Sequence, residues 1–264
     1  MARCIQQLII ALWCALTLAP MTSLEASEYF RPLRQGHSCV AMIHGILPQI
    51  AVYNFSGFTE PLAPYFDNLP IDEPLAALGK PFRRRRFSRF RISAFDHSIE
   101  RIPGQALVQS LENNRLFGEV VRVFEPLESA MVDSSDFKKL VRDFAGALPG
   151  NAFDYEVGVH QIRTSIEPKK MGKEITPVPE GRHRDGFDFV GALVIKRHNI
   201  RGAQTILALS KTAPPKFKTT LLPGQLLIFN DREYFHNATV MKSRNHEQGI
   251  RDVFVLTAEK KERR

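Results

Sequence analysis

The sequence predicts a mainly β domain of the α+β type, a barrel or jelly roll with flanking helices, and three observations predict it. Short β-rich runs recur through the second half of the chain. Turn-forming residues such as Gly202, Pro214 and Pro223-Gly224 separate these runs. Helical spacing is confined to two earlier segments, residues 104–121 and 134–147. Short strands divided by turns are typical of a barrel or jelly roll, and 264 residues are enough for one such domain.

Residues 1–41 are interpreted as a leader or a disordered extension. Arg3 stands before an apolar run at residues 8–20, and the region around Ala26 could form a cleavage site. The apolar run is too short and too poorly flanked for a membrane span. The alternative is a gene start placed too far upstream, with translation beginning at one of two later methionines, Met21 or Met42.

The single domain, residues 42–264, is expected to begin with irregular structure. Six prolines between residues 42 and 82 predict turns and short strands. In residues 83–95 arginines and aromatic residues alternate, which favours a strand. In the helix at residues 134–147, Ser134 or Ser135 is the expected N-cap. Its apolar stripe consists of Phe137, Leu140, Val141 and Phe144.

The second half of the chain is expected to supply most of the strands. Each run is short and rich in β-branched and aliphatic residues, and turn signals lie on both sides of it. The predicted strands are residues 155–163, 189–197, 204–209, 225–230 and 252–258.

Net charge and cysteine content limit the classes of function. The net charge is +8, and six of these charges come from one cluster, Arg83, Arg84, Arg85, Arg86, Arg89 and Arg91, which leaves 8 − 6 = +2 for the rest. A basic field over the whole protein, of the kind that binds nucleic acid, is therefore not indicated. All three cysteines lie within the first 39 residues. A metal site in the domain must then use histidines and carboxylates.

A His-x-Asp pair with a distant histidine is the candidate metal site. His183 and Asp185 are two residues apart, so in an extended segment both side chains point to the same side. His236 follows 51 residues after Asp185. Two imidazoles and one carboxylate on one face of an ion leave adjacent positions open, which is typical of iron(II) oxygenases. The alternatives are a solvated histidine at position 183 and a partly buried histidine at position 236.

Arg251 supplies a second signal for this chemistry. It lies 15 residues after His236 and opens a predicted strand. A 2-oxo diacid that chelates iron needs a fixed cation for its far carboxylate, and arginine suits this bidentate contact better than lysine does. The alternative is an ordinary arginine at a strand edge, paired with a surface carboxylate.

Several stretches resemble the bacterial 2-oxoglutarate–iron dioxygenase family that includes L-isoleucine 4-hydroxylase. Their order along the chain is that of the family, and they are spread over residues 83–258, about two thirds of the sequence. The segment RRRRFSRF resembles a basic-aromatic strand near the start of that family's domain. The matching segments are residues 83–90, 157–163, 179–209, 221–240 and 249–258.

The resemblance implies a double-stranded β-helix, the cupin-like jelly roll, and an enzyme that uses Fe(II), 2-oxoglutarate and O2. It implies that His183, Asp185 and His236 are the iron ligands and that Arg251 holds 2-oxoglutarate. The expected reaction is hydroxylation of a small substrate, a free L-amino acid, with release of succinate and CO2. Because 2-oxoglutarate is a cytosolic metabolite, we expect a cytoplasmic protein, or a secreted or periplasmic one if the leader is genuine.

The chain departs from the family pattern at two places. Gly202-Ala203 stands where the family usually has two glycines. Val253 stands where other branches of the superfamily have the serine of an Arg-x-Ser pair, so the second anchor of 2-oxoglutarate is unassigned.

For contacts with the substrate, Gln161 and Arg163 are candidates because they share one face of a strand that the resemblance places in the site. Arg89 is a third candidate, and the rest of the Arg83–Arg91 cluster is expected to form a solvated basic face. A structural salt bridge is an equally good interpretation of Arg163.

Other classes of function fit parts of the sequence. One is a jelly-roll binding protein without activity. Another is a nucleic-acid-binding module that uses the Arg83–Arg91 cluster, with interleaved phenylalanines as stacking platforms. His183-Arg184-Asp185 also resembles the start of a kinase catalytic loop, but Val190 stands where that loop needs asparagine.

Overall fold

The computed structural model describes residues 41–42, 49–54, 59–93, 96, 98–104, 106–149, 154–168 and 174–261. The expected leader, apart from Ala41, therefore lies outside the described residues. Within those ranges, no helix combines the length and the hydropathy needed to cross a membrane.

Strands dominate the described part of the chain, where five short or medium helical segments accompany them. The helical segments are α2 (Thr59–Leu62), η2 (Ala63–Phe66), α3 (Glu73–Ala76), α4 (Ser129–Asp133) and α5 (Ser135–Ala147). The strands are β1 (Ala41–Met42), β2 (Ile50–Asn54), β3 (Arg83–Ile92), β4 (Ile99–Ile102), β5 (Ala106–Leu107), β6 (Arg122–Val123), β7 (Asp154–Ile166), β8 (Phe189–His198), β9 (Ile200–Gly202), β10 (Thr205–Ala208), β11 (Phe217–Thr219), β12 (Gln225–Asn230), β13 (Phe235–Ala238), β14 (Met241–Ser243) and β15 (Gly249–Lys261).

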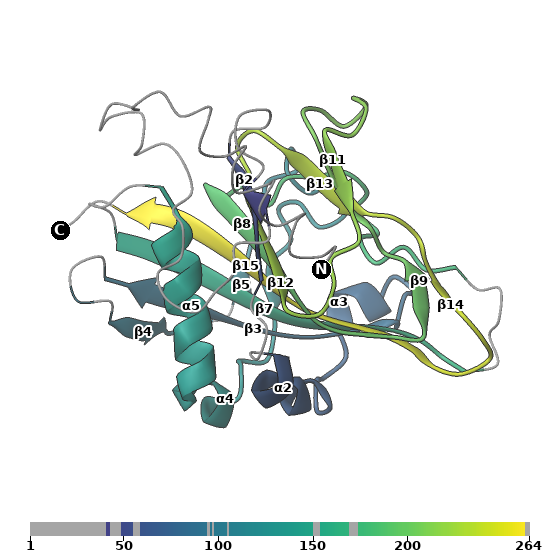
Figure 1. The fold of residues 1–264 in the computed structure, drawn as a ribbon, viewed down its shortest axis with the longest axis horizontal. Coiled ribbons are helices and arrows are strands. Elements are labelled where there is room, and N and C mark those ends of the chain that lie inside the picture. Colours follow the sequence, from purple (N-terminus) through teal and green to yellow (C-terminus); the bar gives the residue numbers. More distant parts are fainter. Residues whose placement is uncertain are drawn as a thin grey trace, which may run out of the picture.

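An eight-stranded antiparallel sheet forms the main layer, in the order β1-β2-β12-β8-β15-β7-β3-β4. Its centre is β15, which pairs with β7 from Gly249↔Ile166 to Lys261↔Asp154 and with β8 on its other side. Because side chains alternate along a strand, each central strand presents alternate residues to two faces. Both faces of this sheet are covered (Figure 1).

Helices cover one face of the main sheet. The N-cap residue Ser134 accepts a hydrogen bond from the backbone N–H of Phe137, which starts α5. The apolar stripe of α5, including Leu140 and Phe144, is fully buried against residues of β7, β8 and β15 such as Val157. In Figure 1 α5 crosses these long strands on one side of the sheet. Burial of this stripe, rather than helix propensity, is what holds α5 in place.

The opposite face of the main sheet packs on smaller sheets. One has the order β11-β10-β13 and another pairs β14 with β9. Leu207 of β10 is buried in one cluster with Val194 of β8, Phe229 of β12 and Val253 of β15. The two layers of strands form a jelly roll, as the sequence predicted, and the space between them contains the functional site.

The predicted helix at residues 134–147 is confirmed as α5, whereas the helix predicted at residues 104–121 is wrong. Residues 106–121 contain β5 and a series of turns without a helix. The side-chain carboxamide oxygen of Asn114 accepts hydrogen bonds from the backbone N–H groups of Leu116 and Phe117. Asparagine favours such local bonds over a helix, so the apolar spacing of this segment was misleading.

Candidate metal centre

Two backbone hydrogen bonds join the histidines that the sequence analysis singled out. The N–H of His183 donates to the carbonyl of His236 at 3.1 Å, and the N–H of His236 donates to the carbonyl of His183 at 2.8 Å. This isolated antiparallel bridge ties the loop before β8 to β13. It fixes the spacing of two side chains that are far apart in sequence.

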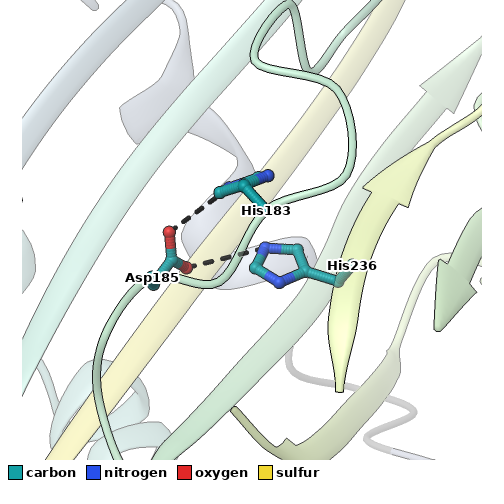
Figure 2. Close-up of side chains that lie close together, drawn as sticks. All are labelled: His183, Asp185 and His236. Atoms are coloured by element: carbon teal, nitrogen blue, oxygen red, sulfur yellow. Dashed lines mark ion pairs between the residues drawn. The ribbon is translucent and has the colours of Figure 1, made fainter. Parts of the chain in front are cut away.

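Asp185 completes the group, and its carboxylate faces both imidazoles (Figure 2). Asp185 Oδ1 lies 3.4 Å from His183 Nε2, and Asp185 Oδ2 lies 3.6 Å from His236 Nε2. One ligand atom from each residue falls within 4.8 Å of the others. The structure thus brings together the three residues predicted as iron ligands, with the donor set of a His₂-carboxylate facial triad.

The ring of His183 is oriented by its other nitrogen. Nδ1 of His183 lies 3.0 Å from the carbonyl of Gly181, where it donates a hydrogen bond and leaves Nε2 free to ligate. An outer partner of this kind fixes the tautomer of a metal-binding histidine. Nδ1 of His236 faces the carboxylate of Asp231 at 3.6 Å, which is beyond hydrogen-bond distance.

The electrostatics of the triad favour a cation at its centre. Burial alone would lower the pKa of His183, but the Asp185 carboxylate outweighs this and raises the pKa to about 9. Burial would raise the pKa of Asp185, yet the facing His236 and His183 hold it well below its usual range. The lowered pKa keeps Asp185 in the carboxylate form that a divalent ion requires, whereas His183 gives up its proton when a metal ion replaces it beside Asp185.

Asp231 is a positioning residue that sequence reasoning missed. Its side chain is fully buried, and its carboxylate accepts backbone N–H groups from Asp185 at 3.2 Å, Gly186 at 2.7 Å and Phe187 at 3.2 Å. These bonds hold the loop that carries Asp185. The sequence predicts only that Asp231 forms part of a turn together with Asn230.

Gln109 is a second missed residue at the triad. Its Nε2 donates to both the backbone carbonyl and Oδ1 of Asp185, each at 3.1 Å. Its Oε1 accepts hydrogen bonds from Asn114 Nδ2 and Arg122 Nη2, which fixes the orientation of the amide. The strand β5 and the turns after it therefore form one wall of the site.

The triad opens into a cavity of about 120 Å³ between the two strand layers. Its apolar wall includes Leu107, Phe187, Val190, Ala192 and Phe229. Its charged and polar wall includes Arg83, Arg85, Gln109, Arg122, His160, Glu180 and Arg251.

Arg251 lies in this cavity, as expected from its position at the start of β15. It is only 8% exposed, and its Nε has no hydrogen-bond partner among the described residues. Burial, and then the neighbouring Arg197, lowers the pKa of Arg251 to about 10. A buried cation with an unused donor fits the far carboxylate of a 2-oxo diacid.

The three predicted substrate contacts lie outside the cavity lining. Gln161 is buried on the helical side of β7, where it donates to the backbone carbonyl of Tyr65. Arg163 points the same way and makes a bidentate pair with Asp252, with Nε–Oδ1 and Nη2–Oδ2 distances of 2.7 Å and 2.8 Å. The strand β7 does line the site, but through its other face, with His160, Ile162 and Thr164.

Arg89 shares a strand face with Arg85 but lies farther along β3. There its Nη1 donates to Oε1 of Glu156 at 3.1 Å, beyond the residues that line the cavity.

The prediction of a solvated basic face for the arginine cluster needs correction. Arg83 and Arg85 are 5% and 6% exposed and line the cavity. Arg84 is exposed on the other side of β3, and Arg86 pairs with Glu125 outside the site. Strand alternation explains this division, because residues 83 and 85 share the face of β3 that looks inward.

Comparisons with known proteins agree with this geometry. The fold is similar to crystal structures of a bsmA homologue from Methylobium petroleophilum PM1 (TM-score 0.67, 24% identity, 80% of this chain and 88% of that chain) and of IDO from Bacillus thuringiensis (TM-score 0.64, 18% identity, 81% and 91%). It is also similar to the Fe(II)/(alpha)ketoglutarate-dependent dioxygenase TqaL (TM-score 0.56, 16% identity, 80% and 77%). At these identities the likeness concerns the fold.

No curated protein sequence matches the chain. Residues 63–257, however, match the model of the family described as 2OG-Fe dioxygenase. This range includes the triad, Arg251 and every residue that lines the cavity. The chain therefore belongs to the 2OG-Fe dioxygenase family.

Proposed function

We propose that this dioxygenase hydroxylates a free L-amino acid, with release of succinate and CO2. Its family uses Fe(II), 2-oxoglutarate and O2. The identity of the substrate class rests on one observation, the mixed charge of the cavity. Beside the triad and Arg251, a second group of buried arginines and the carboxylate of Glu180 line the same space. An amino acid carries both charges and so needs partners of both signs.

His183 Nε2, His236 Nε2 and the Asp185 carboxylate would hold the iron, and Arg251 would hold the far carboxylate of 2-oxoglutarate. When bound, Fe(II) with 2-oxoglutarate and O2 supplies the oxidising chemistry for an unactivated C–H bond. The protein itself holds the proposed ligand side chains in position. Asp231 and Gln109 keep Asp185 in place, and the histidine bridge fixes the other two ligands.

The apolar part of the wall supports a substrate with a small aliphatic side chain. Val190 and Phe229 lie on the main sheet, Leu107 lies on β5 and Phe187 lies in the loop before β8. Such residues exclude water from the reacting carbon and restrict its approach.

A screen of the twenty L-amino acids tests the proposal. Succinate release is measured with Fe(II), 2-oxoglutarate and O2, and each product is examined for the added mass of one oxygen atom. We expect one amino acid or a small aliphatic group to raise succinate release well above the rate without substrate. If no amino acid did so while the metal-loaded protein still turned over 2-oxoglutarate slowly, the amino-acid proposal would be refuted.

A further inference from the structure

Three arginines that have no part in binding the iron gather on one wall of the cavity. Arg83 and Arg85 come from β3 and Arg122 comes from β6, and each is at most 6% exposed. Buried arginines are almost always paired with carboxylates. The pairing in this group is incomplete.

Two carboxylates serve this group, and both favour Arg83. Asp72 Oδ2 lies 2.6 Å from Arg83 Nε and 3.9 Å from Arg85 Nη1. Glu180 Oε1 lies 3.7 Å from Arg83 Nη1. Three positive charges thus face two negative ones on this wall. The next carboxylate, Asp185, faces His183 and His236 in the triad. Once Asp185 is engaged there, one positive charge of the described part of the wall has no counter-ion.

The unbalanced charge is concentrated on Arg85 and Arg122. Among the described residues, Arg122 has no carboxylate within ion-pair distance. Its Nη2 donates to Gln109, its guanidinium lies 4.9 Å from the ring centroid of Phe117, and its Nε finds no partner in the described part of the chain. Arg85 Nε likewise has no hydrogen-bond partner among the residues that the structure describes, and its guanidinium lies 4.3 Å from the ring centroid of Phe124.

His160 does not supply the missing negative charge. Its Nδ1 accepts a hydrogen bond from Arg85 Nη2 at 2.7 Å, which requires the neutral ring. Burial, and then Arg85, lowers the pKa of His160 well below its ordinary value. Its ring stacks on Phe87 at a centroid distance of 4.3 Å. The neutral ring therefore orients Arg85 and leaves the charge of the guanidinium in place.

This group is separate from the co-substrate arginine. Arg251 interacts with Arg197 and Asp252 on the central strands. Arg122 is instead linked to the iron ligand Asp185 through Gln109, which contacts both. The cavity therefore has two cationic positions, one at Arg251 and one at Arg85 and Arg122. A single 2-oxoglutarate binds Arg251 through its far carboxylate and leaves the other position open.

We infer that Arg85 and Arg122 form the subsite for the α-carboxylate of the substrate that is hydroxylated. The inference deepens the proposed function and rests on it. Two guanidinium Nε–H groups without partners, on neighbouring buried side chains, suit the two oxygens of one carboxylate. Because one glutamine separates Arg122 from Asp185, this carboxylate lies close to the iron ligands.

Three matched ligands test the subsite without catalysis. They are the best L-amino acid of the screen, its primary amide, which lacks the negative charge, and its deamino acid, which lacks the ammonium group. Binding is measured by calorimetry on protein loaded with Fe(II) and 2-oxoglutarate in the absence of O2. In the wild-type protein we expect the amide to bind at least roughly thirtyfold more weakly than the amino acid.

Arg122→Gln is the main variant, because removing the guanidinium of Arg122 leaves no carboxylate without its ion-pair partner. It should lose the preference for the amino acid over the amide, while 2-oxoglutarate affinity changes little. Arg122→Lys should restore part of the preference, since it keeps the charge but not the planar fork. Arg85→Gln is the second variant, and Arg84→Gln, on the outward face of the same strand, is the control that should behave as the wild type.

The outcomes separate this inference from the proposed function. If an amino acid is hydroxylated but its amide binds equally well, or Arg122→Gln loses 2-oxoglutarate instead, the subsite assignment is overturned and the function stands. If no amino acid binds, 3-methylbutanoate and 4-methylpentanoate replace it as probes. Binding of these acids that Arg122→Gln abolishes supports the subsite and refutes the amino-acid substrate. Binding that Arg122→Gln does not change, or no binding, overturns the subsite.

Discussion

The fully buried carboxylate of Asp231 accepts the backbone N–H of Asp185 at 3.2 Å, so the residue directly after β12 holds the loop that carries one of the three proposed iron ligands. The same carboxylate accepts two further N–H groups of that loop. We therefore expect iron binding to depend on a residue that is not itself one of the three proposed ligands.

Asp231→Asn tests this dependence. An amide has one acceptor oxygen and carries no charge, so at least one N–H of the loop is left without a partner. We expect a loss of about 1–3 kcal/mol in the free energy of unfolding and weaker iron binding. Urea unfolding and a metal titration measure the two effects. Asp143→Asn, which breaks a surface pair with Lys139, is the control and should cost under about 0.5 kcal/mol; equal losses in both variants would contradict the role of Asp231.

Gln109→Leu removes the side-chain donor to Asp185 at similar volume. Loss of an outer partner typically weakens metal binding by about tenfold to a hundredfold. We expect the Fe(II) affinity of Gln109→Leu to fall by a factor in that range. An anaerobic Fe(II) titration provides the measurement. Glu112→Gln, in the same turn region but exposed, should bind Fe(II) as the wild type does. Unchanged affinity in Gln109→Leu would show that the contact with Asp185 has no effect on the metal.

His160 predicts a pH dependence of stability. Burial lowers its pKa in the folded protein, whereas in the unfolded chain the pKa is about 6.5. Below that pH the unfolded chain takes up a proton that the folded protein does not, so acid favours unfolding. His160→Gln keeps an acceptor for Arg85 and removes this proton uptake. Between pH 7 and 5.5 the variant should lose about 1 kcal/mol less stability than the wild type. Urea unfolding at both pH values measures this, and parallel losses would contradict a neutral, buried His160.

Arg251 predicts a selective effect on the co-substrate. Arg251→Ala should weaken 2-oxoglutarate binding by about thirtyfold to several thousandfold, since a buried carboxylate would lose its partner. Fe(II) binding should stay nearly unchanged. Arg251→Lys should recover only part of the affinity because an ammonium group cannot make the planar fork. Calorimetry with Fe(II) and without O2 gives both affinities. If Arg251→Ala bound 2-oxoglutarate as tightly as the wild type does, Arg251 would have a structural role only.

The sequence predicted those features that depend on local periodicity. The stripe from Phe137 to Phe144 and the N-cap Ser134 define α5. The spacing of His183 and Asp185 predicted a shared site because two residues apart on an extended chain point the same way. His236 was a candidate as the distant histidine of this motif, and the family resemblance then implied that it is the third ligand.

The features that the sequence did not predict depend on which part of the fold packs against each face of a strand. The alternation of side chains along a strand places Gln161 and His160 on opposite faces of β7. It does not show that η2 packs on the face of Gln161, where Gln161 donates to the backbone carbonyl of Tyr65. The same holds for Arg83 and Arg85, whose charge suggested solvent although they line a cavity. Asp231 and Gln109 act through hydrogen bonds to residues far away in the sequence, and such contacts leave no periodic signal.

Iron binding by Asp185→Ala is the most direct test of the account, because Asp185 is the carboxylate that joins both histidines. Bound Fe(II) per protein is measured anaerobically after removal of free metal, together with succinate release from 2-oxoglutarate. Wild-type protein and the surface variant Asp143→Ala should each hold one iron and release succinate. Asp185→Ala should hold none and release none while its circular dichroism spectrum stays that of the folded protein. A folded Asp185→Ala protein with one bound iron and wild-type succinate release would contradict the assignment of the triad.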